Sequence, residues 1–146
     1  KVKESNKKWR EDNPDYHKEY YKKWYENNKE HLNEYQRHRR SIDPLYALTQ
    51  RIRSLIGFSF SNNGYSKQSR THEILGCSYE DFHVHIESQF LPGMNWDNRD
   101  RWHLDHKTPI SWAKTEERTY ELNHYTNFQP LWEEDNERKG NRWSDY

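Results

Sequence analysis

Cysteine, aliphatic side chains and long apolar runs are scarce in this 146-residue chain, and each scarcity excludes a class of structure. Cys77 is the single cysteine, so the chain can form neither an intramolecular disulfide nor a Cys-x-x-Cys zinc site. No apolar run approaches the roughly 18 residues of a membrane span, and no signal-peptide pattern opens the chain. We therefore expect a protein of the cytoplasm that makes no membrane contact.

Aromatic residues make up more than half of the small apolar set, with 23 Phe, Trp and Tyr against 21 aliphatic, Met and Cys residues. The core is therefore expected to be small and rich in rings, whose NH or OH groups need polar partners when buried. The length favours one domain with an appended segment.

The net charge of zero hides an uneven distribution. Residues 1–53 hold 14 Lys and Arg against 9 acids, a net of +5, whereas residues 54–146 hold 10 against 15, a net of −5. A basic half attracts polyanions such as DNA, and an acidic half gathers carboxylates around a site for cations.

The first 41 residues contain only two aliphatic side chains, Val2 and Leu32, and so cannot build a core of their own. An internal repeat indicates two copies of a short helical unit, with Asn13 and Asn28 as N-caps and Pro14 as a first helical residue. Fifteen positions separate the repeated residues, which are Trp9, Asn13 and Tyr20, then Trp24, Asn28 and Tyr35.

Tyr16, Tyr20 and Trp24 stand four residues apart and are expected to line one helical face. Such a face either docks on the rest of the protein or on a partner, or belongs to an arm that lays Lys and Arg along DNA phosphates. Both interpretations can hold together.

The middle of the chain predicts two further helices. Asp43 and Pro44 begin one, which Gly57 should end, and residues 59–70 are rich in turn formers and predict a mobile loop. Ser78 and Asp81 form a capping box for the next helix, whose apolar side carries Phe82, Ile86 and Phe90 and which Pro92 and Gly93 should stop.

Residues 102–139 carry the chemistry. Alternation of side chains predicts a strand over 102–106. The expected elements that follow are an insertion helix over 116–123 after Thr115, a second strand over 126–131, and a helix over 133–139 closed by Gly140. Asp105 and Asn136 offer hard oxygen ligands for a divalent cation, His106 offers a base near neutral pH, and Lys139 offers positive charge for a phosphate. These are the residue types that phosphodiester hydrolysis requires.

The same residues, in the same order, resemble the HNH endonucleases, also called ββα-metal or His-Me finger nucleases, of the type encoded by phages and mobile elements. The resemblance rests on Asp105-His106, Pro109, Asn127, Asn136 and Lys139, and more loosely spans residues 75–143. It implies an α+β fold, in which a ββα-metal (His-Me finger) nuclease core over residues 102–142 lies within a nuclease domain of residues 58–146. A helical arm, residues 1–57, would precede it and bind DNA.

The resemblance also implies roles. Asp105 and Asn136 would bind one divalent ion, with Mg²⁺ expected and Mn²⁺ able to substitute, and no structural zinc is expected. His106 would be the catalytic base, Lys139 would meet the phosphate, and Asn127 would support catalysis by bonding the loop backbone and holding the base.

Further candidates come from position and charge. His103 and His124 are candidates for an additional metal ligand or a DNA contact, and for His124 a packing or phosphate role is favoured over metal ligation. The basic side chains expected to contact DNA are Arg37, Arg39, Arg40, Arg51, Arg53, Arg138 and Arg142.

The sequence thus predicts a metal-dependent DNA endonuclease acting in the cytoplasm of a bacterial host. Two alternatives stay open: a catalytically silent DNA-binding module, and an adaptor that recruits phage packaging or replication proteins through its aromatic arm. The sequence does not determine the target site, the choice between nicking and double-strand cutting, or the oligomeric state.

Overall fold

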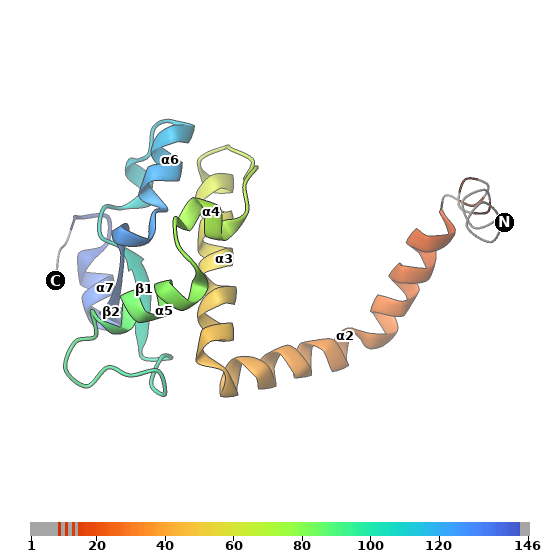
Figure 1. Ribbon diagram of the computed structural model, residues 1–146, viewed down its shortest axis with the longest axis horizontal. Coiled ribbons are helices and arrows are strands. Elements are labelled where there is room, and N and C mark those ends of the chain that lie inside the picture. Colours follow the sequence, from red (N-terminus) through yellow and green to blue (C-terminus); the bar gives the residue numbers. More distant parts are fainter. Residues whose placement is uncertain (1–8, 10, 12, 14, 144–146) are drawn as a thin grey trace. The chain divides into compact units, whose positions relative to one another are not determined.

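The structure is a computed structural model that describes residues 9, 11, 13 and 15–143, and its helices and two strands confirm the predicted α+β class (Figure 1). The chain divides into two compact units, residues 1–42 and 43–146. The boundary lies at residue 42 rather than at the predicted residue 57. The reason is that the intervening helix buries Leu48, Ile52 and Ile56 in the core of the second unit.

Helix α2, Tyr16–Ile42, forms the described part of the first unit and buries none of its residues. The prediction that Asn28 caps a second helix is wrong, because Asn28 lies within α2 and its Nδ2 donates to the Trp24 carbonyl at 2.7 Å. Asn13 makes the equivalent bond to the Trp9 carbonyl at 2.9 Å instead of capping with its side chain, and Pro14 lies outside the described residues. Among the described residues, the repeat is visible as the same side-chain bond from Asn13 and from Asn28.

Helix α3, Pro44–Asn62, begins as predicted, since the Asp43 side chain accepts from the Tyr46 backbone N–H at 2.9 Å and Pro44 occupies the first turn. The prediction that Gly57 ends this helix is wrong. The helix continues for five residues because Ser59 and Phe60 are buried against the core, and burial outweighs the weak helix propensity of one glycine. Only residues 63–70 of the predicted loop therefore lie outside regular structure.

Two short helices follow. Helix α4, Thr71–Leu75, was not predicted, and α5, Tyr79–Glu87, is capped as predicted by Ser78, whose Oγ accepts from the Asp81 N–H at 3.0 Å. Helix α5 ends before Phe90, so the predicted extension to Pro92 is wrong.

The last third of the chain folds in the predicted order. Strand β1, Trp102–His106, pairs antiparallel with β2, Phe128–Trp132, in a register that sets Asp105 opposite Gln129 and His106 opposite Phe128. Between the strands lie the 3-10 helix η1, Ile110–Trp112, the insertion helix α6, Glu116–Leu122, and the 3-10 helix η2, Tyr125–Asn127. Helix α7, Glu133–Lys139, follows β2 directly and ends at Gly140.

The two strands lie between α7 and the core (Figure 1). Trp102, Leu104 and Phe128 face a cluster built mainly by α3 and α5, whereas alternate residues of β1 face α7. Burial on both sides stabilises a two-stranded sheet that would be marginal in isolation. In the described part of the chain, no helix combines the length and apolar character needed to cross a membrane.

Candidate functional site

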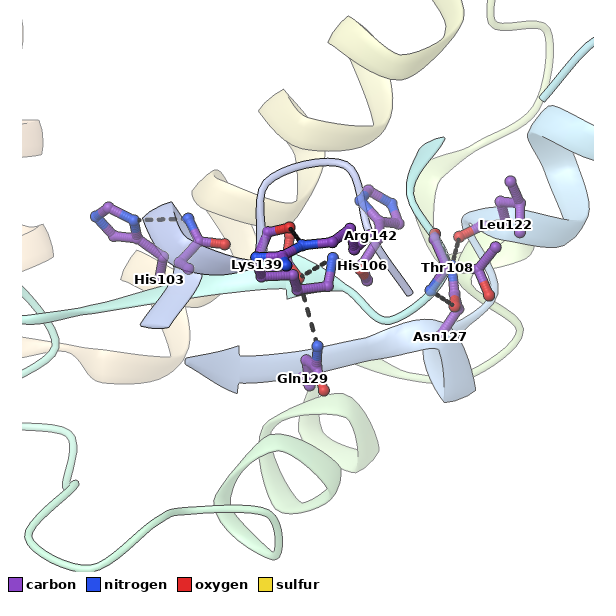
Figure 2. Close-up of polar contacts among 10 residues, drawn as sticks. His103, His106, Thr108, Leu122, Asn127, Gln129, Lys139 and Arg142 are labelled. Carbon is purple, nitrogen blue, oxygen red and sulfur yellow. Dashed lines mark hydrogen bonds and ion pairs between the residues drawn. The ribbon is translucent and has the colours of Figure 1, made fainter. Parts of the chain in front are cut away.

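Helix α7 places two polar side chains, Asn136 and Lys139, one turn apart on the face that meets β1, and Figure 2 shows Lys139 beside this strand. Asn136 Nδ2 lies 3.1 Å from His103 Nδ1, and Lys139 Nζ lies 3.0 Å from Asp105 Oδ2. Since His103 and Asp105 are two residues apart on one strand, they share a face. The structure therefore brings the predicted ligands Asp105 and Asn136 to the same junction between β1 and α7.

Lys139 is 5% exposed, and its ammonium also donates to the His106 carbonyl at 2.8 Å. Lys139 is therefore not an ordinary solvated lysine. The ammonium balances the Asp105 carboxylate and ties the end of α7 to the end of β1, and its role as a phosphate contact stays a prediction.

Gln129 is a second neighbour of Asp105 that the sequence did not single out. It lies opposite Asp105 in the strand pairing, and its Nε2 donates to Asp105 Oδ2 at 3.4 Å. The Gln129 side chain is buried, so together with Lys139 it holds one carboxylate oxygen in place.

His106 points to the opposite face of β1 from Asp105, because successive side chains of a strand alternate. It retains only 7% of its exposed surface, and its ring packs on Phe128 with centroids 4.3 Å apart. Its Nε2 lies 3.1 Å from Asn123 Oδ1.

The surroundings of Asn123 determine which His106 nitrogen carries the proton. Asn123 is fully buried, and its Nδ2 donates to the Thr119 carbonyl at 2.8 Å and to Ser59 Oγ at 2.6 Å. The Ser59 hydroxyl in turn donates to the Ile56 carbonyl, so its oxygen accepts from Asn123. A flipped amide would set its oxygen against two acceptors, so Oδ1 must face His106. Neutral His106 therefore carries its proton on Nε2, and Nδ1 is the basic nitrogen.

Burial lowers the pKa of His106 from its ordinary value near 6.5. The hydrogen bond to Asn123 and the negative charge of Asp105 act in the opposite direction, and the charge of Lys139 lowers the pKa further. The imidazole is consequently neutral at physiological pH, the form in which it can accept a proton.

Asn127 makes the loop contacts that the sequence predicted (Figure 2). Its Oδ1 accepts from the Thr108 N–H at 2.9 Å, and its Nδ2 donates to the carbonyls of Thr108 and Leu122. Its own carbonyl accepts from the Lys107 N–H at 2.7 Å. Asn127 thus fixes the turn that follows His106, while its contribution to catalysis stays a prediction.

His124 packs away from this junction. Its Nδ1 lies 2.9 Å from Thr126 Oγ1, and its ring covers Gly76 so closely that a Cβ there would lie 2.6 Å from the imidazole. In the described part of the chain no hydrogen bond joins His124 to Asp105 or Asn136, so of the two roles left open by the sequence, packing and phosphate binding, the geometry favours packing. His103 lies at the junction, with Nε2 3.9 Å from Glu133 Oε1.

The predicted DNA-contacting arginines fall into two groups. Arg37, Arg39 and Arg40 are exposed on α2, and Arg53 and Arg138 are exposed in the second unit.

Arg51 and Arg142, by contrast, bond to the protein backbone. Arg51 Nη1 donates to the Trp102 carbonyl at 3.4 Å, and burial lowers its pKa. Arg142 donates to the carbonyls of Arg138 and Lys139, which closes the C-terminal end of α7.

The donor groups at the junction suit a hard cation. Among the described residues no group of three or more His, Cys, Asp or Glu side chains is close enough to hold an ion, so a site here would combine Asp105, Asn136 and water. Mg²⁺ binds in this way, because it keeps several waters. Lys139 occupies Asp105 Oδ2, and Asn136 Nδ2 faces His103. The oxygen donors that fit an ion are therefore Asp105 Oδ1 and Asn136 Oδ1.

Asn123, Ser59 and Gln129 were missed because their positions give no local signal. Asn123 ends the insertion helix α6, and Ser59 comes from a segment predicted as loop. Only Gln129 was accessible to sequence reasoning, since a correct register of β1 and β2 pairs it with Asp105.

Comparison with known proteins finds one informative relative. A protein of Acanthamoeba polyphaga mimivirus, described as uncharacterized protein L246, is 32% identical over 99 residues, which cover 64% of this chain and 41% of that protein. The chain thus matches about two fifths of the length of that viral protein. No sequence-family profile matches the chain, and no solved structure matches it.

Proposed function

We propose that this protein is a metal-dependent endonuclease of the HNH type that hydrolyses DNA phosphodiester bonds. The observation that carries the proposal is the convergence of Asp105 and Asn136, 31 positions apart in the sequence, on one junction between β1 and α7. A base candidate, His106, follows Asp105 directly, and its ring lies on the other face of the same strand.

Asp105 and Asn136 would hold the ion through their Oδ1 atoms. A divalent ion at this place supplies positive charge that stabilises the developing negative charge of a phosphodiester under attack. The two side chains come from rigid elements, and Gln129 and Lys139 restrain Asp105 further. This arrangement preorganises the oxygen donors.

His106 would take the proton of the attacking water at Nδ1. Asn123 supports this role, because accepting from Nε2–H keeps the lone pair on Nδ1 and fixes the ring plane. Asn127 holds the backbone that follows, so the imidazole is restrained from two directions. A positioned base typically contributes about a hundredfold to ten-thousandfold.

Supercoiled plasmid tests the proposal directly. With Mg²⁺ we expect nicked or linear product from the parent protein, and with a chelator intact plasmid. Asp105→Asn should lose cutting, whereas Asp97→Asn, which removes the same charge from an exposed loop, should keep it. Equal cutting by Asp105→Asn and the parent would contradict the assignment of Asp105 as a ligand.

One observation favours a second candidate, a catalytically silent DNA-binding module. The buried Lys139 ammonium lies 3.0 Å from Asp105 Oδ2, where its charge opposes a cation. Calorimetry with Mn²⁺ separates the candidates. The endonuclease requires binding that Asp105→Ala weakens more than Asn136→Ala, because a carboxylate is the stronger ligand for a hard cation. DNA binding by a protein that takes up no Mn²⁺ would favour the silent module.

Part of the proposal concerns biological setting. The similarity to a mimivirus protein supports a viral origin. Action on DNA inside the infected cell is part of the proposal and rests on the β1–α7 junction alone. Packaging or replication proteins as partners of the aromatic arm remain the proposed alternative use of residues 1–42.

A further inference from the structure

The second unit, residues 43–146, has another charged region that lies outside the β1–α7 junction. A surface hollow of about 260 Å³ is formed where the C-terminal half of α3, the loop before α4, and the start of α5 come together. The side chains that line it are Arg53, Lys67, Arg70, Thr71, His72 and Tyr79.

The lining is basic and contains no acid. Among the described residues, no carboxylate lies within ion-pairing distance of Arg53, Lys67 or Arg70. The nearest acid in sequence, Glu73, is directed to the backbone, where its Oε2 accepts from the Arg70 N–H at 2.7 Å. The positive charges of the hollow are therefore not neutralised by the protein itself.

Hydrogen-bond donors of different kinds meet in the same hollow. Guanidinium groups donate in a fork that matches two phosphate oxygens, an ammonium donates as a point charge, and Tyr79 adds a hydroxyl. Charge and donor geometry together fit a phosphate group.

A second hollow provides the opposite case. It has a volume of about 560 Å³ and is lined by Arg101, Trp132 and four acids, which are Asp100, Glu133, Glu134 and Asp135. Such a surface repels a polyanion. Of the two hollows, only the one lined by Arg53, Lys67 and Arg70 has the sign of charge that suits a phosphate.

We propose that the hollow formed by Arg53, Lys67, Arg70 and His72 binds a backbone phosphate of DNA. The proposal rests on the proposed endonuclease function and adds a contact within the nuclease unit, separate from the arm. A phosphate contact of this kind positions the duplex without reading its sequence. It also contributes to affinity through counterion release, so its removal reduces the salt dependence of binding.

The test is fluorescence anisotropy of a short mixed-sequence duplex, measured in chelator so that no cutting is required. Lys67→Gln/Arg70→Gln is compared with Lys114→Gln/Arg118→Gln, which removes the same charge from exposed positions, one of them already paired with Glu121. Each phosphate that is no longer neutralised should lower the slope of log affinity against log salt by about 0.9. Raising the salt from about 50 to about 200 mM weakens DNA binding by the parent protein. For each phosphate contact that the variant has lost, this weakening should be about 3.5-fold smaller than in the parent.

The hollow is supported if only the Lys67/Arg70 variant shows the lower slope and weaker binding. An equal effect in both variants would show that net charge alone acts, and an unchanged slope in the first would also overturn the proposal. Inorganic phosphate, compared with chloride at equal ionic strength in a thermal unfolding assay, separates the sources of phosphate. Inorganic phosphate could stabilise the parent but not the Lys67/Arg70 variant, while both proteins bind DNA equally. That result would overturn the assignment of the hollow to DNA.

Different experimental results would contradict the phosphate-binding hollow and the endonuclease function. Parental plasmid cleavage by a protein whose DNA binding ignores Lys67 and Arg70 would remove the hollow and leave the endonuclease in place. DNA binding that depends on the hollow, in a protein that cuts no plasmid, would remove the catalytic function alone.

Discussion

Helix α2 leaves Trp24 44% exposed and buries no residue, whereas the second unit buries the ring of Phe60 completely. The two units thus use aromatic residues in opposite ways. Rings of α2 contact one another along the helix, as Tyr16 and Tyr20 do with centroids 6.4 Å apart, while those of the second unit form a core against which β1 and β2 pack. A helix held mainly by local contacts is only marginally stable in water. Precise chemistry therefore belongs to the second unit, and the first is suited to contacts with another molecule.

The largest expected effect sharpens this division. His106→Ala should reduce plasmid cutting by about a hundredfold to ten-thousandfold, because it removes the base while leaving Asp105 and Asn136 in place. His38→Ala on α2 serves as the control, since His38 is exposed in the first unit. Cleavage rates with Mg²⁺ measure both variants. Near-parental cutting by His106→Ala would show that another group accepts the proton.

The second expected effect separates the units by stability. Phe60→Ala should lower the free energy of unfolding by about 3 to 5 kcal/mol, because it leaves a cavity beside Tyr120, whose ring centroid lies 4.7 Å away. Trp24→Ala should change it by less than about 0.5 kcal/mol. Urea denaturation of the full chain, followed by circular dichroism, measures both. Similar losses of unfolding free energy in the two variants would mean that Trp24 is buried against another surface in solution.

Lys139→Met tests the buried ion pair of the second unit. We expect a loss of about 2 kcal/mol in the free energy of unfolding, because Asp105 and the His106 carbonyl both lose a charged donor. Lys29→Met on the exposed surface of α2 should be nearly neutral. Unfolding in urea provides the measurement, and unchanged stability in Lys139→Met would argue against the pair. Tighter Mn²⁺ binding in this variant is expected as well, since a competing positive charge is gone.

The pH dependence of stability should come from the second unit. Burial, mainly, lowers the pKa of both His85 and His106, and the charge of Lys107 lowers that of His85 further. Between these lowered values and about 6.5, the unfolded chain binds more protons than the folded one. The free energy of unfolding therefore decreases as pH falls through about 6.5, with a slope of at most about 1.4 kcal/mol per pH unit for each histidine.

Denaturation at a series of pH values measures this slope, and His85→Gln should make it shallower. His31→Gln, a substitution at an exposed position of α2, is the comparison variant. Stability that rises on acidification through the same range would contradict the proposed burial of the two imidazoles.

The smallest expected effect concerns the first unit. Deleting residues 1–42 should leave the proposed metal site unchanged, since Asp105 and Asn136 both lie in the second unit. If the arm tracks the DNA backbone, the deletion should lower the slope of log affinity against log salt by about 0.9 for each phosphate that the arm neutralises. Anisotropy at several salt concentrations measures it. A slope equal to that of the full chain would leave docking or partner recruitment as the role of the arm.

Elements whose ends are set by neighbouring residues could be predicted from the sequence. The Asp43 cap, the Ser78 cap and the stop of α7 at Gly140 depend on contacts within one turn, and all three are present. Gly57 and Asn28 misled the prediction for the opposite reason. The helix through Gly57 continues because distant segments bury Ile56 and Phe60, and Asn28 satisfies its amide within a helix that does not break.

The candidate site, too, was predictable from the sequence only in part. The motif predicted ligand and base residues by their order and spacing, and the structure brings two of them, Asp105 and Asn136, to one junction, while their roles stay predictions. The burial of Lys139 and the bond from His106 to Asn123 depend on how α6 and α7 pack on the strands. No pattern in the sequence specifies that packing, so these contacts required the structure.

The register of β1 against β2 determines where the sequence can accept insertions. Asp105 faces α7 and His106 faces the core only while Asp105 lies opposite Gln129 and His106 opposite Phe128. A slip of one residue would turn the imidazole toward α7 and bury the carboxylate beside the aromatic core, at a large desolvation cost. Insertions within β1 are therefore expected to be lethal to activity, whereas the connection from η1 through α6 can change length as long as it returns β2 in the same frame.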